Sequence, residues 1–341
     1  MTIVAILALI SGVVSYLLTA LVRQYALRND VLDHPNERSS HTAPTPRGGG
    51  MAVLAALFLS LVVGTAADAI TARDAWTLGL GTLVVGLVGW LDDHGGLRPS
   101  TRFAAHVAAG IWTLSMFGGL PSLVVGDSSV SLGIAGFVLG VVGVVWSINL
   151  FNFMDGIDGL AGSQALLIFG AASVLLFVRG DRSLGTIALT LATASLGFLA
   201  WNWPPARIFM GDAGSGALGY LIAGITIGSE NRHAVPGIVF GILSGVFIAD
   251  ATVTLLRRLA RGNRPHEAHR DHAYQRLSRA WGSHRAVTVG AGALTLALCG
   301  LAALATHTPQ LLIPCLLAAC GALAAVLLAV ERRAAFHRVG A

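Results

Sequence analysis

The stretch SLGIAGFVLGVVGVVWSINLFNFMDGIDGL, residues 131–160, joins an apolar run directly to a polar cluster. Residues 131–149 carry no charged side chain, and a helix needs roughly 20 apolar residues to cross about 30 Å of hydrocarbon. At the end of this run, two asparagines and two aspartates recur at every third position: Asn149, Asn152, Asp155 and Asp158. We therefore expect a membrane-spanning helix that ends at a polar site.

The composition of the whole chain is that of a membrane protein. Of its 341 residues, 55% are hydrophobic and 11% are charged, and the mean hydropathy is +0.73, which lies outside the usual balance of soluble domains. The predicted fold is an all-α polytopic membrane protein that forms one domain over residues 1–341. The first apolar stretch is expected to be a retained span, because no positive region precedes it and no small-residue cleavage site follows it. About eleven transmembrane helices are expected, near residues 2–22, 49–67, 76–91, 102–120, 131–149, 160–178, 183–201, 214–229, 235–256, 286–305 and 310–330.

The arginines indicate how these helices are oriented. The chain contains no lysine, and if the eleven spans alternate, one set of loops holds 18 of the 22 arginines. Because cytoplasmic loops carry the excess of basic residues in membrane proteins, the N-terminus is predicted outside and the C-terminus in the cytoplasm. The basic pI of 9.7 then requires no nucleic-acid partner. The polar clusters all fall in the predicted cytoplasmic loops, at about residues 23–48, 92–101, 150–159, 202–213 and 257–285.

The repeat after the fifth stretch needs a broken helix to act as one site. Along a continuous helix, steps of three residues rotate by about −60° each, so the four side chains would spread over half the circumference. Gly156 and Gly159 are predicted to end the helix near Phe153 and to bend the next turn back. Two amide oxygens and two carboxylates at a negative helix end would suit Mg²⁺ or Mn²⁺ better than zinc. The alternative is that the asparagines cap a helix and the aspartates form a turn.

A second acidic motif is WLDDHGGLRPSTRF, residues 90–103. Asp92 and Asp93 follow an apolar stretch directly, and adjacent carboxylates repel each other unless they share a cation or a proton. Acids at a membrane edge are functional by default, so both are candidate catalytic residues. The alternative is a solvated helix end.

A third acid, Asp212, lies in WNWPPARIFMGDAGSGALGY, residues 201–220. The Gly-Ser-Gly run that follows is expected to open a helix whose free N–H groups could hold phosphate oxygens while Asp212 holds a metal ion. The alternative is close helix packing through small residues. Phe209 is expected either to stack on a base or to anchor at the membrane interface.

Two further loops carry cationic side chains. Arg47 lies between a proline and three glycines, where the backbone can approach a ligand closely. His266, His269 and His272 recur at steps of three in the longest predicted cytoplasmic loop. A zinc site is one interpretation of these histidines, but polyanion binding agrees better with an otherwise all-oxygen set. The arginines of this loop could also contact anionic membrane lipids.

Taken together, these groups indicate metal-assisted phosphoryl transfer. The chain offers five aspartates, amides and arginines in its motifs and no candidate Ser-His-Asp or Cys-His set. In such chemistry, positioning and charge neutralisation carry the catalysis. Because the site is predicted at a membrane surface, one substrate is expected to be lipid-borne and the other a soluble phosphorylated donor.

At the motifs SSHTAPTPRGGG, DDHGGL, NLFNFMDGIDGLAG and FMGDAGSGALGY, which occur in this order, the chain resembles the polyprenyl-phosphate N-acetylhexosamine-1-phosphate transferases, glycosyltransferase family 4. This family includes the phospho-N-acetylmuramoyl-pentapeptide transferases. The resemblance implies Mg²⁺-dependent transfer of an N-acetylhexosamine 1-phosphate from a UDP-sugar to undecaprenyl phosphate, with release of UMP. It also implies a site on the cytoplasmic face of the bacterial inner (plasma) membrane and a product that starts a lipid-linked cell-surface glycan.

The resemblance also assigns roles by position. The magnesium ligands would be Asn152 and Asp212, the acid pair Asp92 and Asp93, and the nucleotide-side residues Asp155, Asp158 and Phe209. Asp92 would be the group that deprotonates the lipid phosphate. Arg47, Asn149 and the three histidines are expected to bind substrate. A single displacement and a covalent intermediate at Asp212 both stay open.

The donor sugar and the pathway are not fixed by these motifs. The text HEAHRDHAYQRL, residues 266–277, is more similar to the O-antigen and capsule branch than to the pentapeptide branch. A GlcNAc-1-phosphate transferase for teichoic-acid or arabinogalactan-type polymers is the alternative. A transporter and an inactive scaffold are alternatives from other classes, although the span interiors are nearly free of charge apart from Asp250. The role of Asp250 and the oligomeric state, with a homodimer as one candidate, are open.

Overall fold

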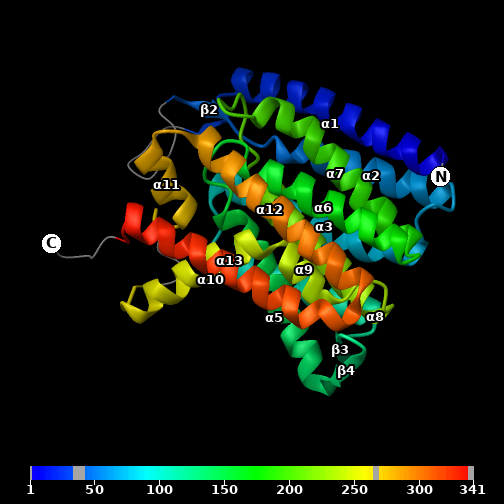
Figure 1. Ribbon diagram of the computed structural model, residues 1–341. Coiled ribbons are helices and arrows are strands. Elements are labelled where there is room, and N and C mark those ends of the chain that lie inside the picture. The colour runs from blue at the N-terminus through cyan, green and yellow to red at the C-terminus, as the bar shows by residue number, and fades with distance from the viewer. Residues whose placement is uncertain (1, 34–42, 264–268, 337–341) are drawn as a thin grey trace.

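The computed structural model describes residues 2–33, 43–263 and 269–336. It is a bundle of helices with two short β-hairpins (Figure 1). The helices are α1 (Thr2–Arg28), α2 (Gly50–Ala66), α3 (Ala72–Gly95), α4 (Pro99–Phe117), α5 (Gly133–Phe153), α6 (Leu160–Val178), α7 (Arg182–Asn202), α8 (Asp212–Asn231), α9 (Gly237–Leu243), α10 (Gly245–Ala260), α11 (Ala273–Trp281), α12 (His284–His307) and α13 (Leu312–Arg333). Antiparallel pairs are formed by β1 (Leu32–Asp33) with β2 (Thr45–Pro46) and by β3 (Ser122–Val125) with β4 (Ser128–Ser131).

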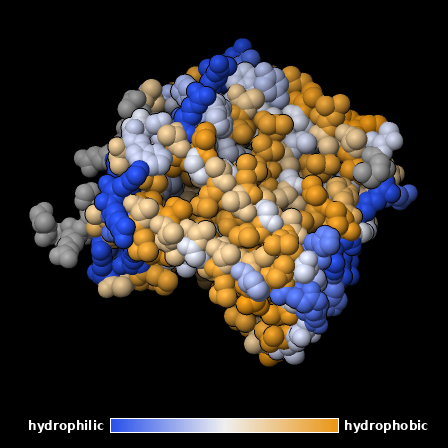
Figure 2. Space-filling view, viewed as in Figure 1, coloured by the Kyte–Doolittle hydropathy of each residue, from blue (hydrophilic) through white to orange (hydrophobic). Residues whose placement is uncertain are grey.

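The helices confirm a polytopic membrane protein, but they do not confirm the expected count. Among the described residues, seven helices are long and apolar enough to cross a membrane, or eight if the bent pair α9 and α10 is one span. These two helices meet at 80°. All eleven expected stretches coincide with helices, yet α2 has only 17 residues and α4 and α8 carry charged residues near their ends. Figure 2 shows a broad hydrophobic surface between hydrophilic residues at two ends of the molecule.

Helix α8 is the centre of the bundle and fixes the place of the third acidic motif. Most of its residues are buried, and it packs mainly against α3 and α5. Glycines allow the close approach at its start. A Cβ atom on Gly89 of α3 would lie 2.5 Å from the backbone N of Ala213, and one on Gly50 of α2 would lie 2.3 Å from the Cα of Gly214. Asp212, the first residue of α8, is therefore held between α2 and α3.

Helix α5 ends near the position that was expected from Gly156 and Gly159. The last residue of α5 is Phe153, and the next helix begins at Leu160 after Gly159, whose φ of +74° favours glycine. The turn between them therefore lies at the C-terminal end of α5. In Figure 1, this end of the bundle also carries β2, α11 and the C-terminal end of α13, while the start of α1 and the hairpin β3–β4 lie at the other.

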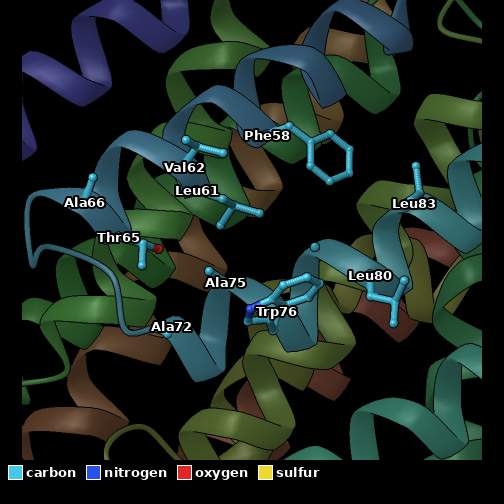
Figure 3. Close-up of a pocket in the computed structure, with 11 residues that line it drawn as sticks. Phe58, Leu61, Val62, Thr65, Ala66, Ala72, Ala75, Trp76, Leu80 and Leu83 are labelled. Carbon is cyan, nitrogen blue, oxygen red and sulfur yellow. The ribbon is translucent and has the colours of Figure 1, made fainter.

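A hollow of about 500 Å³ opens between α2 and α3 (Figure 3). Its lining is apolar apart from Thr65 and includes Phe58, Leu61 and Trp76. None of the residues that line it can titrate. This hollow is suited to contact hydrocarbon and offers no group for acid–base or metal chemistry.

Candidate active site

The predicted polar residues of α5 open into a second hollow of about 750 Å³. It is bounded by α4, α5, the α5–α6 turn, α10 and the start of α11. One wall of this hollow is apolar, and the rest of its lining is polar. The apolar wall comes from α4 and α5, with Phe103, Val107, Val141, Val142, Val145 and Trp146; the polar part holds Arg102, Asn149, Asn152, Asp155, His269 and His272. The cavity can therefore accept a charged group joined to a hydrocarbon chain.

Three of the four repeated polar residues line this hollow. Asn149 donates its side-chain N–H to the backbone oxygen of Val145 at 2.7 Å. Asn152 reaches toward α8, where its Nδ2 donates to Ser215 Oγ at 3.2 Å. Burial, and then the carboxylates of Asp212 and Asp93, raise the pKa of Asp155 well above its usual range. The carboxylates of Asp155, Asp212 and Asp93 therefore lie close enough to disfavour one another's ionisation.

Asp158 does not join these three residues. Its Oδ2 accepts the backbone N–H of Ala206 at 3.0 Å, and its Oδ1 lies 3.2 Å from Nδ1 of His284. Its backbone oxygen accepts from Thr288 at 2.9 Å. The turn after Phe153 thus directs Asp158 toward the α7–α8 loop and the start of α12, whereas a simple gathering of all four side chains was expected.

The two adjacent aspartates at the end of α3 have different partners. Asp92 accepts the backbone N–H of Leu97 at 2.6 Å and pairs with Arg102, which lines the hollow. Asp93 is almost fully buried and faces the start of α8 instead. Asp92 is therefore placed at the edge of the hollow, and Asp93 beside Asp212.

The start of α8 differs from the expected phosphate cradle. The N–H of Asp212 donates to Asp93 Oδ1 at 3.2 Å, and the N–H of Ala213 donates to Asp93 Oδ2 at 3.4 Å. The N–H groups of Gly214 and Ser215 bond to the backbone oxygen of Gly211 at 3.1 Å. Because Asp93 already satisfies the first two amides, these groups are not free to hold a phosphate. The sequence could not indicate this, because the partner comes from another helix.

Arg47 lies beside Asp93, and the backbone of Phe209 is bonded to that of Pro46, the residue before Arg47. Arg47 is 3.3 Å from Asp33 and 3.8 Å from Asp93, so its guanidinium offsets part of the local negative charge. The backbone N–H of Phe209 donates to the oxygen of Pro46 at 2.8 Å, and its oxygen accepts from Gly49 at 2.9 Å. These contacts bring the loops at residues 23–48 and 202–213 to the site.

Two of the three predicted histidines line the hollow, and His266 lies outside the described residues. The rings of His269 and His272 have centroids 4.9 Å apart. Burial, then His272 and Arg258, lower the pKa of His269 to about 4, so it is neutral near pH 7. Nδ1 of His272 lies 3.3 Å from Oδ1 of Asp250.

Comparisons with known proteins identify the family of this chain. A family model described as glycosyl transferase family 4 matches residues 75–230, which include Asp92, Asp93, the α5 repeat and Asp212. A phospho-N-acetylmuramoyl-pentapeptide-transferase of Mycolicibacterium paratuberculosis is 33% identical over 300 residues, covering 72% of this chain and 80% of the relative. The chain belongs to glycosyl transferase family 4.

Other relatives of this transferase carry names that specify N-acetylglucosamine. A decaprenyl-phosphate N-acetylglucosaminephosphotransferase of Mycolicibacterium smegmatis is 29% identical over 318 residues, which are 82% of this chain and 77% of the relative. A probable undecaprenyl-phosphate N-acetylglucosaminyl 1-phosphate transferase of Bacillus subtilis is 29% identical over 277 residues, covering 79% and 75%. The resemblance inferred from the motifs is thus confirmed at the level of the family.

The side chains of the transferase fit magnesium better than zinc. Within the ranges that the structure describes, no group of three His, Cys, Asp or Glu side chains could hold a metal ion. Asn152 hydrogen-bonds Asp212, and a rotated amide would present its oxygen at the same place. Mg²⁺ typically uses one or two protein oxygens together with water and substrate phosphates, which is what Asn152 and Asp212 can offer.

Some residues of the site were not predicted. Arg102, Tyr274 and Gln275 line the hollow. The position of Arg102 could have been predicted from the sequence. Pro99 marks the start of a helix and places Arg102 in its first turn, near the acid pair. Tyr274 and Gln275 lie two and three residues after His272, but their position depends on how α11 packs.

Proposed function

We propose that this protein transfers an N-acetylhexosamine 1-phosphate from a UDP-sugar to undecaprenyl phosphate or a related polyprenyl phosphate. A phosphate oxygen of the lipid forms a bond to the phosphorus that carries the sugar, the bond from that phosphorus to the UMP oxygen breaks, and UMP leaves. The observation that carries the proposal is the hollow, whose polar part continues into the apolar wall of α4 and α5. This shape suits a phosphate head with an isoprenoid tail.

We assign Mg²⁺, with Mn²⁺ as the other candidate, to Asn152 and Asp212. When bound, the ion would neutralise phosphate charge and act as a Lewis acid. The side chains of the protein would bind the phosphates, position the helices and accept the proton. Arg47 and the histidines would hold phosphate oxygens, Asp93 would keep the start of α8 in place, and Asp92, at the edge of the hollow beside Arg102, would accept the proton of the lipid phosphate.

The expected topology is part of this proposal. Eleven spans, with the N-terminus outside and the C-terminus in the cytoplasm, would put the site on the cytoplasmic face of a bacterial inner membrane. The uneven distribution of arginines supports this orientation. So does the gathering of β2, α11 and the C-terminal end of α13 at one end of the bundle (Figure 1).

The donor is best tested first as UDP-GlcNAc, because the names of two relatives specify N-acetylglucosamine. The pathway would be the start of an O-antigen, a capsule or a teichoic-acid or arabinogalactan-type polymer. The histidine loop favours the first two, and the relatives' names favour a GlcNAc donor.

The test is release of UMP by the purified protein with undecaprenyl phosphate and Mg²⁺. UDP-GlcNAc, UDP-GalNAc, UDP-FucNAc and UDP-QuiNAc would be compared in parallel, with and without EDTA. We expect release with one of these donors, loss of release in EDTA, and recovery on adding Mg²⁺. Folded protein that releases no UMP from any of them would contradict the proposal.

A further inference from the structure

Asp250 lies in the apolar helix α10, and no role for it follows from the sequence. Only 5% of the residue is exposed, yet its carboxylate has four polar partners. Oδ1 accepts the backbone N–H of Ala273 at 2.8 Å and the hydroxyl of Thr254 at 3.1 Å, and it lies 3.3 Å from Nδ1 of His272. Oδ2 accepts the backbone N–H of Tyr274 at 3.0 Å. Three of these partners belong to the start of α11 and none is an arginine.

These contacts replace a missing cap. The first backbone N–H groups of a helix have no partner within the helix, and the residue before α11, His272, makes no side-chain hydrogen bond to them. Asp250 satisfies two of these groups from another helix. Its charge also complements the positive end of α11. Asp250 therefore determines where α11 begins.

The same carboxylate fixes the state of the His272 ring. A carboxylate oxygen only accepts, so Nδ1 of His272 must be the donor. That leaves Nε2 as the nitrogen available to a ligand. His272 lines the hollow that also contains Asn152 and Asp155. Asp250 does not line the hollow itself, but it contacts His272, which does.

A second connection runs through Tyr274. Its hydroxyl donates to the backbone oxygen of Phe153, the last residue of α5, at 2.9 Å. The fit is close, because a Cβ atom on Gly156 would lie 2.1 Å from that hydroxyl. The start of α11 is therefore joined to the turn that carries Asp155.

We propose that Asp250 is a positioning residue of this transferase, which acts through His272 and Tyr274. It holds Nε2 of His272 toward a phosphate oxygen of the bound substrate and holds α11 against the α5–α6 turn. The phosphate belongs either to the polyprenyl phosphate or to the nucleotide sugar. This inference rests on the proposed function for its kinetic test.

The kinetic test compares Asp250→Asn in the parent and in a His272→Gln background. We expect Asp250→Asn alone to lower kcat/KM by about 10- to 100-fold, the usual effect of removing a group that orients a ligand. The KM of one substrate should rise, and which of the two rises identifies the phosphate. In the His272→Gln protein, Asp250→Asn should have a smaller effect, because residues that act as a unit are not additive.

Two substitutions serve as controls. Thr254→Val removes a partner of Asp250 without touching α11, and it should leave kcat/KM near the parent value. Asp127→Asn makes the same chemical change in the exposed turn between β3 and β4, where the carboxylate accepts from Gln310 at 2.8 Å. An equal fold-loss from Asp250→Asn in both backgrounds would mean a purely structural role and would overturn the proposal.

A measurement without turnover separates this inference from the proposed function. Hydrogen exchange on the full chain in detergent should show loss of protection over residues 273–281 in Asp250→Asn, with α12 unchanged. This readout remains valid even if the parent releases no UMP from the donors above. Unchanged protection of α11 would contradict the holding role directly.

Discussion

At the scale of single residues, the carboxylate of Asp212 is a proposed metal ligand, while its backbone contributes to the fold. Its N–H donates to Asp93, and this contact does not depend on the side chain. We therefore expect Asp212→Asn to keep the thermal midpoint of the parent and to lower turnover about 1,000-fold, because a Lewis acid is worth several kcal/mol and each 1.4 kcal/mol is tenfold. Thermal unfolding and UMP release of the two purified proteins measure these two effects. An active Asp212→Asn protein would remove this residue from the site.

Asp155 gives a pH-dependent prediction in the metal-free protein. Burial and the neighbouring carboxylates raise its pKa, so the folded protein binds this proton more tightly than the unfolded chain. Stability is therefore fully present below the ordinary pKa of Asp, about 3.9, and falls as the pH rises toward the raised value. Asp155→Asn removes this fall. In EDTA at about pH 7.5, the thermal midpoint of Asp155→Asn should exceed that of the parent.

The same experiment has an internal comparison. Mg²⁺ should raise the midpoint of the parent more than that of Asp155→Asn, because the ion relieves a repulsion that the variant no longer has. Asp127→Asn, in the distant β3–β4 turn, should behave like the parent throughout. Identical pH profiles for the parent and Asp155→Asn would show that Asp155 is not under electrostatic strain.

At the scale of elements, the crossing of α3 and α8 sets the position of Asp212. A Cβ atom on Gly89 would meet the backbone of Ala213, with 2.5 Å to its N and 2.6 Å to its Cα. Overpacking of this kind costs about 1–3 kcal/mol, and a shift of about 1 Å near reacting groups can cost about 100-fold in rate. We expect Gly89→Ala to lower both the thermal midpoint and kcat.

A glycine in the same helix provides the control for that prediction. A Cβ atom on Gly79 would lie 3.3 Å from Leu61 Cδ1, the end of a flexible side chain, in the wall of the apolar hollow of Figure 3. Gly79→Ala should therefore be close to neutral in both measurements. Equal activity in Gly79→Ala and Gly89→Ala would show that the start of α8 can shift without affecting Asp212.

The sequence predicts those parts of the site whose contacts lie within one element. It does not predict contacts between residues that are distant in the sequence. The end of α5 at Phe153 followed from local glycines, and the lining of the hollow by Asn152 and Asp155 followed from that end. The contacts of Asp158 with α12 and of Asp93 with α8 did not, because helices distant in the sequence supply the partners. The expected count of eleven spans is likewise not confirmed, because seven or eight of the described helices are long and apolar enough to cross a membrane.

At the scale of the whole molecule, α3 holds α8 at both ends. Asp93, near the end of α3, satisfies the first amides of α8. At the opposite end of the bundle, Arg232 follows α8 and pairs with Asp74 in the first turn of α3 and with Asp181 at 3.0 Å. Asp74 is fully buried, whereas Arg232 stays partly open to solvent, so the contact shields the carboxylate of the pair. The active-site end and the opposite end are thereby joined by one rigid helix pair.

The proposed orientation of this helix pair in the membrane can be tested with single cysteines. In a protein whose Cys299, Cys315 and Cys320 are replaced by alanine, Asp127→Cys would place a thiol in the exposed β3–β4 turn and Arg98→Cys would place one between α3 and α4. If the arginine-rich loops face the cytoplasm, a membrane-impermeant maleimide should label Asp127→Cys in intact cells and Arg98→Cys only after permeabilisation. The reverse pattern would invert the topology and place the site outside, where a nucleotide-sugar donor made in the cytoplasm could not reach it. Labelling of both thiols in intact cells would mean that α3 and α4 do not both cross the membrane, and it would reduce the count of spans.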